Sequence, residues 1–212
     1  MRRVVVKLGG STAYHAEMRN WVAILTASQR PLVLVPGGGP FADRVREAQG
    51  EMGFSDRAAH FMAIMAMDQM GLALLDMDTR LTLARSLEEI DSALTSGKLP
   101  VWLPSQMCDA AEDIAQSWDV TSDSLAAWLA ARIGAEALLL IKQTDAFEDA
   151  DGIEALVAAG IVDLLLPAML GEATALHLAG PASLATAHER LAANTLPGRN
   201  FSASMAGRRG AA

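Results

Sequence analysis

The sequence is poor in lysine and in cysteine. Only Lys7, Lys98 and Lys142 are lysines among the 212 residues, and Cys108 is the single cysteine. One cysteine excludes an internal disulfide, and such a residue usually behaves as a small, largely buried side chain. The formal net charge is −8, whereas binding along a nucleic acid backbone requires clustered Lys and Arg. The composition therefore predicts neither a disulfide framework nor a nucleic acid partner.

Long apolar runs are also missing. The apolar run that begins at residue 4 ends at Lys7, which leaves it too short for the core of a secretion signal. No stretch reaches the ~18 uninterrupted apolar residues that cross a bilayer, and Asp163 and Pro167 interrupt the strongest candidate. We therefore expect a cytoplasmic protein with no membrane partner.

Short apolar runs alternate with longer segments of helical periodicity, as in α/β proteins with a mainly parallel sheet covered on both faces. The expected strands are 3–8, 31–35, 80–84, 100–103, 137–141 and 175–179. The expected helices are 16–28, 41–49, 56–75, 87–95, 122–133, 152–159 and 181–193. We predict a three-layer α/β/α sandwich, with one domain over 1–206 and a flexible tail at 207–212.

The helix expected over 56–75 is apolar on nearly all sides and contains four methionines. A helix of this kind is buried, either in the domain core or in a subunit interface. One small domain could hardly cover its whole surface, so we expect it to pack against its counterpart in a homodimer or a larger homo-oligomer.

Two strands expected near the N-terminus end in glycines. The first ends in Lys7-Leu8-Gly9-Gly10-Ser11, which alone is also compatible with a tight turn beside an exposed lysine. The second ends in Pro36-Gly37-Gly38-Gly39 and leads into a helix, where backbone N–H groups and the helix dipole favour an anion. Neither segment matches GxGxxG or GxxxxGK[ST]. Because ligands of α/β sheets bind at the carboxyl ends of the strands, the pair predicts phosphate binding.

Polar residues also follow two later elements. Asp123 lies in the first turn of the helix expected over 122–133, where it either stabilises the helix dipole or holds Lys7 and the glycine loops in register. Asp119 either also holds Lys7 and the glycine loops in register or caps the helix. The apolar strand over 137–141 ends in Lys142-Gln143-Thr144-Asp145, at the same edge of the sheet.

The motifs KLGGS, PGGG, TSDS and LLLIKQTD, in this order, resemble the amino acid kinase family. The resemblance runs from Arg3 to about Gly198 and includes a closing segment, LHLAGPASLATAHERL. Residues 60–69 and 118–124 look most like the kinases that act on [5-(aminomethyl)furan-3-yl]methyl phosphate in methanofuran and methylofuran biosynthesis. The resemblance implies an amino acid kinase fold, ATP and Mg²⁺ as cofactors, and a small-molecule phosphate substrate.

The resemblance also implies roles for individual residues. The catalytic residues would be Lys7 and Asp123. The ATP-binding residues would be Gly9, Gly10, Ser11, Lys142, Thr144 and Asp145. The substrate-binding residues would be Gly37, Gly38, Gly39, Arg44, His60 and Asp119, although His60 is equally compatible with an internally bonded helix histidine. No side chain is expected to bind a metal directly, because Mg²⁺ would be held mainly by ATP phosphates and water.

The sequence departs from the family pattern in its C-terminal half. Many members have a second phosphate-binding lysine there, but no lysine follows Lys142. Either Lys142 binds the phosphate in place of that second lysine, or an arginine does so, or this positive charge is missing. The usual Asp-Gly turn reads Asp145-Ala146. Three other functions stay open: a non-catalytic phosphate or oxyanion storage protein resembling the molybdenum storage proteins, a nucleotide-sensing regulatory subunit, and a kinase for a nucleoside monophosphate or an isoprenoid phosphate.

Overall fold

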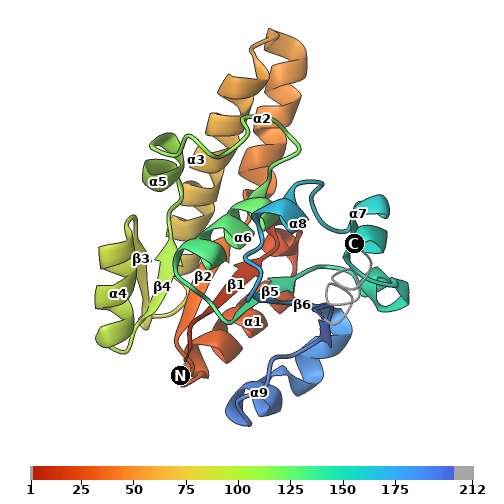
Figure 1. Ribbon diagram of the computed structural model, residues 1–212. Helices are drawn as coiled ribbons and strands as arrows, with labels where there is room; N and C mark the ends of the chain where they lie inside the picture. The colour runs from red at the N-terminus through yellow and green to blue at the C-terminus, as the bar shows by residue number, and fades with distance from the viewer. Residues whose placement is uncertain (1, 203–212) are drawn as a thin grey trace.

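The computed structural model describes residues 2–202 (Figure 1). Within this range one seven-stranded sheet has the order β3-β4-β2-β1-β5-β6-β7. All neighbouring strands pair in parallel except β6 and β7, which are antiparallel. The strands are β1 Val4–Leu8, β2 Leu32–Pro36, β3 Leu81–Ala84, β4 Leu99–Trp102, β5 Ala137–Ile141, β6 Ala175–Ala179 and β7 Arg199–Asn200. The six predicted strands are confirmed, and β7, which has only two residues, was not predicted.

The seven predicted helices also form, with ends that differ by up to three residues. The helices are α1 Ala16–Ala27, α2 Gly39–Met52, α3 Asp56–Leu75, α4 Leu87–Thr95, α5 Ser105–Asp109, α6 Ser122–Arg132, α7 Ile153–Ala158, α8 Leu166–Met169 and α9 Leu184–Ala192. Three 3-10 helices are η1 Gly10–Tyr14, η2 Ala146–Asp149 and η3 Pro181–Ser183. Thus the helix predicted over 181–193 begins as η3, and the short α5 and α8 were not predicted.

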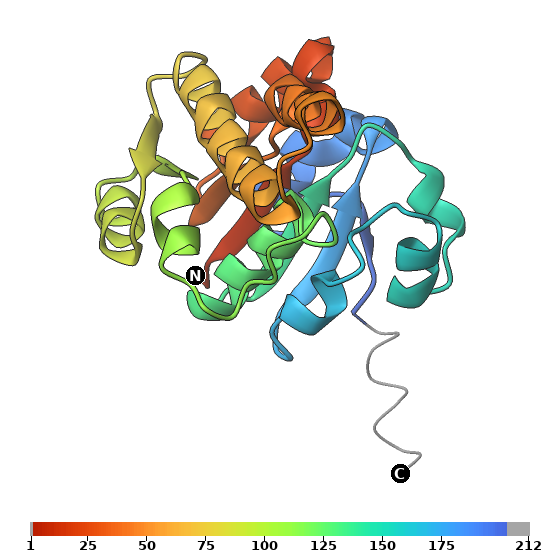
Figure 2. The ribbon, with the colours of Figure 1, turned by 90° about the horizontal axis from the view of Figure 1, so that it is seen from above.

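Helices cover both faces of the sheet, which confirms the three-layer prediction (Figure 2). One layer of the core contains α1, α9 and the C-terminal half of α3, packed on side chains such as Val4, Val6 and Leu34. The other contains α4 and α6, packed on Val5 and Leu138. The central strands β1, β2 and β5 are buried along their whole length, as their continuous apolar sequences require.

Helix α3 has the length and the mean hydropathy, 1.4, of a membrane-spanning helix, but 44% of its most apolar window is buried within the fold. Its residue Gly71 packs so closely on the sheet that an added Cβ would lie 2.4 Å from a methyl group of Leu103. In Figure 1, α2 and α3 extend together beyond the carboxyl ends of the strands. Met62, Met65 and Leu72 remain 37%, 42% and 52% exposed, and the homo-oligomer stays a prediction. The tail predicted at 207–212 lies outside the described residues.

Candidate active site

The two glycine-rich loops lie in direct backbone contact at the carboxyl ends of β1 and β2. The N–H of Gly37 donates to the carbonyl of Leu8 over 2.9 Å. A Cβ added at Gly10 would lie 2.3 Å from the nitrogen of Gly39, and one added at Gly37 would lie 2.3 Å from the nitrogen of Gly10. No side chain fits between these loops, so glycine is required at both positions.

A buried carboxylate lies between two ammonium groups next to these loops. Asp123, in the first turn of α6, is only 3% exposed. Lys7 Nζ lies 2.9 Å from its Oδ1, and Lys142 Nζ donates to its Oδ2. The contact with Lys7 is an ion pair without hydrogen-bond geometry. The three side chains form one group, which we call the lysine–aspartate triad.

The carboxylate of the triad is held in its charged form by the two lysines. Burial raises the pKa of Asp123, but Lys7 and then Lys142 lower it by more, so the pKa lies below the ordinary value. Burial lowers the pKa of Lys142, and Asp123 raises it only in part. Removing one member of a buried ion pair typically costs about 3–5 kcal/mol of stability. The buried carboxylate of Asp123 therefore holds both lysine side chains at the carboxyl ends of the strands.

The parallel pairing of β1 with β5 explains why the two lysines meet. Lys7 pairs with Leu140 and Leu8 with Ile141, so Lys7 and the residue that follows β5 lie near the same end of the sheet. Lys142 follows β5 directly and reaches Asp123 from the side opposite Lys7. Lys142 is one of the alternatives for the second lysine that the sequence lacks, and its ammonium group shares the Asp123 carboxylate with Lys7.

A cavity of about 230 Å³ adjoins the glycine loops. Of the residues predicted to bind substrate or ATP, it is lined by Gly10, Ser11, Gly38, Gly39 and His60. Its other walls come from α2, α3 and the start of α6, and include the apolar side chains Ile64, Met67 and Trp118. We call it the acceptor cavity, since it is bounded by the loop predicted to hold the acceptor's phosphate.

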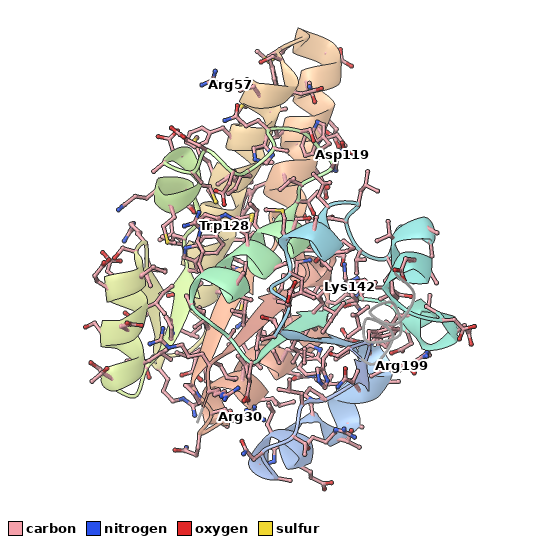
Figure 3. The ribbon with its side chains drawn as sticks, in the orientation of Figure 1. Arg30, Arg57, Asp119, Trp128, Lys142 and Arg199 are labelled. Carbon is pink, nitrogen blue, oxygen red and sulfur yellow. The ribbon has the colours of Figure 1, made fainter. Side chains whose placement is uncertain are left out.

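Arg44 and Asp119 do not line this cavity. The side chain of Arg44 is 81% exposed and pairs with Glu47. Asp119 is exposed and accepts a hydrogen bond of 3.3 Å from Ser117 Oγ. In Figure 3, Asp119 lies beside the α2–α3 pair and well apart from Lys142. Neither position has a contact in the structure that supports the role implied by the family resemblance.

The cation that does line the acceptor cavity is Arg46. Its guanidinium lies 4.3 Å from the centre of the Trp118 ring, and Trp118 Nε1 donates to Gln49 Oε1 over 2.7 Å. The family resemblance gave this role to Arg44, and the expected helix began at residue 41 rather than at Gly39. With the start at Gly39, the helical spacing of i, i+3, i+4 and i+7 gives 39, 42, 43 and 46 as the cavity face.

His60 joins α3 to the segment before α6. It is 5% exposed, and its Nδ1 lies 3.1 Å from the carbonyl oxygen of Ser117. Burial lowers the pKa of His60 although the Ser117 carbonyl raises it, so the ring is neutral with Nδ1–H as the donor. Its Nε2 has no hydrogen-bond partner within residues 2–202. His60 is thus internally bonded through Nδ1, as one of the two alternatives expects. Its Nε2 atom can still accept a hydrogen bond beside the cavity.

The residues after β5 are mainly bonded to their own loops. Thr144 Oγ1 accepts from the N–H of Ala146 over 3.1 Å. The carboxylate of Asp145 accepts from the N–H of Ala182, with distances of 3.3 and 3.1 Å, and so ties this loop to the start of η3. Among residues 2–202, no group of three or more His, Cys, Asp or Glu side chains is placed to hold a metal ion.

Comparisons with known proteins agree with this geometry. The sequence model of the amino acid kinase family matches residues 2–156. The [5-(aminomethyl)furan-3-yl]methyl phosphate kinase of Methanocaldococcus jannaschii is 27% identical over 156 residues, which cover 68% of each chain.

Solved uridylate kinase structures share the fold. The enzyme of Archaeoglobus fulgidus superimposes with a TM-score of 0.67 at 19% identity, over 94% of this chain and 99% of that one. The UMP kinase of Bacillus anthracis superimposes with a TM-score of 0.62 at 14% identity, over 94% of this chain and 95% of that one. Since the family match spans more than half of the sequence and the fold and strand-end motifs agree with it, the chain belongs to the amino acid kinase family.

Proposed function

We propose that this protein is an ATP-dependent kinase that transfers the γ-phosphoryl group to the phosphate of a small acceptor. The observation that carries the proposal is the lysine–aspartate triad beside the glycine loops. Phosphoryl transfer depends on positioning and on neutralising the charge of the equatorial oxygens. Lys7 and Lys142 supply two positive charges for those oxygens, and Asp123 holds both in place.

The reaction needs little else from the protein. An acceptor phosphate has a second pKa of ~6, so it is anionic at neutral pH and requires no general base. Its oxygen attacks the γ-phosphorus, the bond to the bridging oxygen breaks, and ADP leaves with the electron pair. Gly9, Gly10, Ser11, Lys142, Thr144 and Asp145 would face ATP, whose phosphates would carry the Mg²⁺.

We place the acceptor's phosphate against Gly37, Gly38 and Gly39, with Arg46 in the role first given to Arg44. The N–H groups at the start of α2 and the Arg46 guanidinium both favour an anion there. The rest of the acceptor would lie against the apolar walls and His60 Nε2, which accepts a hydrogen bond.

For the acceptor itself we propose [5-(aminomethyl)furan-3-yl]methyl phosphate, in a cytoplasmic pathway of methylofuran or methanofuran synthesis. Support comes from the Methanocaldococcus jannaschii relative. It also comes from a cavity of about 230 Å³ that combines Trp118 and Met67 with phosphate-binding features at one end. A small aromatic ring with a donor group suits such a cavity.

A ³¹P NMR experiment tests this function. Purified protein is incubated with Mg·ATP and, separately, with the furan phosphate, UMP and isopentenyl phosphate. We expect diphosphate resonances and ADP to appear together with the furan acceptor. A protein that consumes no ATP with any acceptor, yet retains a polyoxometalate cluster through purification, would be a storage protein instead.

A further inference from the structure

Asp163, in the connection between α7 and α8, caps the N-terminus of α6. Its carboxylate accepts from the N–H of Thr121 over 2.8 Å, from the Thr121 hydroxyl over 2.8 Å and from the N–H of Ser124 over 3.0 Å. Thr121 occupies the N-cap position but makes no capping bond with its own side chain. A carboxylate 42 residues away in the sequence therefore satisfies the N–H groups that a local cap would normally bind.

The turn that Asp163 holds carries two parts of the active site. Asp123, the carboxylate of the triad, lies in it between Lys7 and Lys142. Thr121 and Ser122 line the acceptor cavity. A shift of this turn would move the triad and a cavity wall together, and a misplacement of about 1 Å can cost ~100-fold in rate.

Asp163 also acts on the triad through its charge. Lys142 is surrounded by Asp123 from α6, Lys7 from β1 and Asp163 from the α7–α8 connection. Burial lowers the pKa of Lys142, as does Lys7, whereas Asp123 and more weakly Asp163 raise it. With Asp163 ionised, two lysines face two carboxylates; without its charge, the group has one uncompensated positive charge.

We propose that Asp163 is a positioning residue for phosphoryl transfer, which fixes the first turn of α6 and thereby the placement and charge of the lysine–aspartate triad. The inference rests on the kinase function proposed above. Asp163 does not itself line the acceptor cavity, and it acts through its hydrogen bonds to Thr121 and Ser124, which hold the turn that contains Asp123.

The test compares Asp163→Asn with Asp113→Asn. Asp113 binds the other end of the same helix: it accepts from Trp128 Nε1 over 3.0 Å and from Arg132 Nη2 over 3.0 Å. Trp128 lies well apart from Lys142 in Figure 3. Both variants remove one charge and weaken the anchoring of α6, so loss of helix stability alone would affect them alike.

We expect Asp163→Asn to lower kcat about 10- to 100-fold and Asp113→Asn to leave it within threefold at a similar loss of thermal stability. Equal kcat values for the two variants would overturn the inference. Should Asp163→Asn fail to fold, Thr121→Val removes the hydroxyl donor alone. It is expected to lower kcat by more than threefold, and a smaller effect would count against the inference.

A second readout requires no turnover. Because the chain has only three lysines, ¹³C labelling at lysine Cε gives a simple spectrum, in which Lys98→Arg assigns the signal of Lys98. We expect Lys142 to titrate at lower pH in Asp163→Asn than in the parent, and at an unchanged pH in Asp113→Asn. An unchanged Lys142 titration in both would refute the inference. A parent protein that transfers no phosphoryl group would refute the kinase function alone.

Discussion

Arg44 and Arg46 provide a matched pair of substitutions for testing how the acceptor is held. Both lie on α2, two residues apart, and each pairs with an acidic residue three positions away, but only Arg46 lines the acceptor cavity. Arg46→Ala removes a cation from the cavity wall, and Arg44→Ala removes one from the exposed face. The two variants have the same charge and the same loss of side-chain volume.

The magnitude follows from the exposure of Arg46. A hydrogen bond to a charged group contributes about 1.5–3 kcal/mol, and the Arg46 side chain is 56% exposed, so solvent screening reduces the expected loss to about 1–2 kcal/mol. At about 1.4 kcal/mol per tenfold, the KM for the acceptor should rise ~5- to 30-fold in Arg46→Ala, with kcat changed far less. Arg44→Ala should change KM less than ~2-fold, as expected for an exposed surface residue.

Initial rates at saturating Mg·ATP and varied acceptor concentration measure both parameters. The temperature of unfolding is recorded for each variant, because Arg46 also stacks on Trp118. If Arg46→Ala keeps the parent KM, or if Arg44→Ala raises KM by the larger factor, the acceptor's phosphate does not bind at this face of α2.

Three further predictions concern the loops, the surface and the pH dependence. Gly10→Ala should abolish acceptor binding, measured by calorimetry, since the new Cβ would lie 2.3 Å from the nitrogen of Gly39; normal binding would show that the loops can separate. Met65→Glu with Leu72→Glu should convert a dimer into a monomer in sedimentation, as both are exposed on α3; a monomeric parent at micromolar concentration would contradict the interface. Burial, then Arg190 and Arg30, lowers the pKa of His177 to about 4, so stability present above pH ~6.5 should be lost as pH falls toward 4. In urea unfolding, the His177→Gln variant should lose less stability than the parent over this pH range. An equal loss in both proteins would show that His177 does not cause the pH dependence.

The sheet could be predicted from the sequence because each central strand is a short, continuous apolar run between helical segments. The glycine loops, Lys7, Asp123 and Lys142 were found for the same reason: they directly follow such strands or begin a helix at the strand ends. Strand β7 escaped prediction since its residues Arg199 and Asn200 have no apolar pattern to recognise.

The rest of the site depends on information that single positions in the sequence do not hold. Arg46 and Arg44 both lie on α2, and only the packing of this helix beside the cavity shows which of them faces it. Asp163 contacts Thr121 across 42 residues of sequence, and such a long-range bond leaves no local motif. In the sequence alone, Asp163 was visible only as an interruption of an apolar segment.

In the proposed reaction, Lys7 neutralises charge on the transferring phosphoryl group. Lys7→Met removes the ammonium group but keeps most of the side-chain volume, and Asp123 retains Lys142 as its partner. Lys98→Met is the control, because Lys98 is exposed and its ammonium group donates to the carbonyl of Thr79 over 2.9 Å. Steady-state kinetics should show kcat reduced ~100- to 1,000-fold in Lys7→Met, with the KM for ATP changed less than about threefold. A folded Lys7→Met variant with kcat within threefold of the parent and of Lys98→Met would show that Lys7 does not neutralise charge on the transferring phosphoryl group.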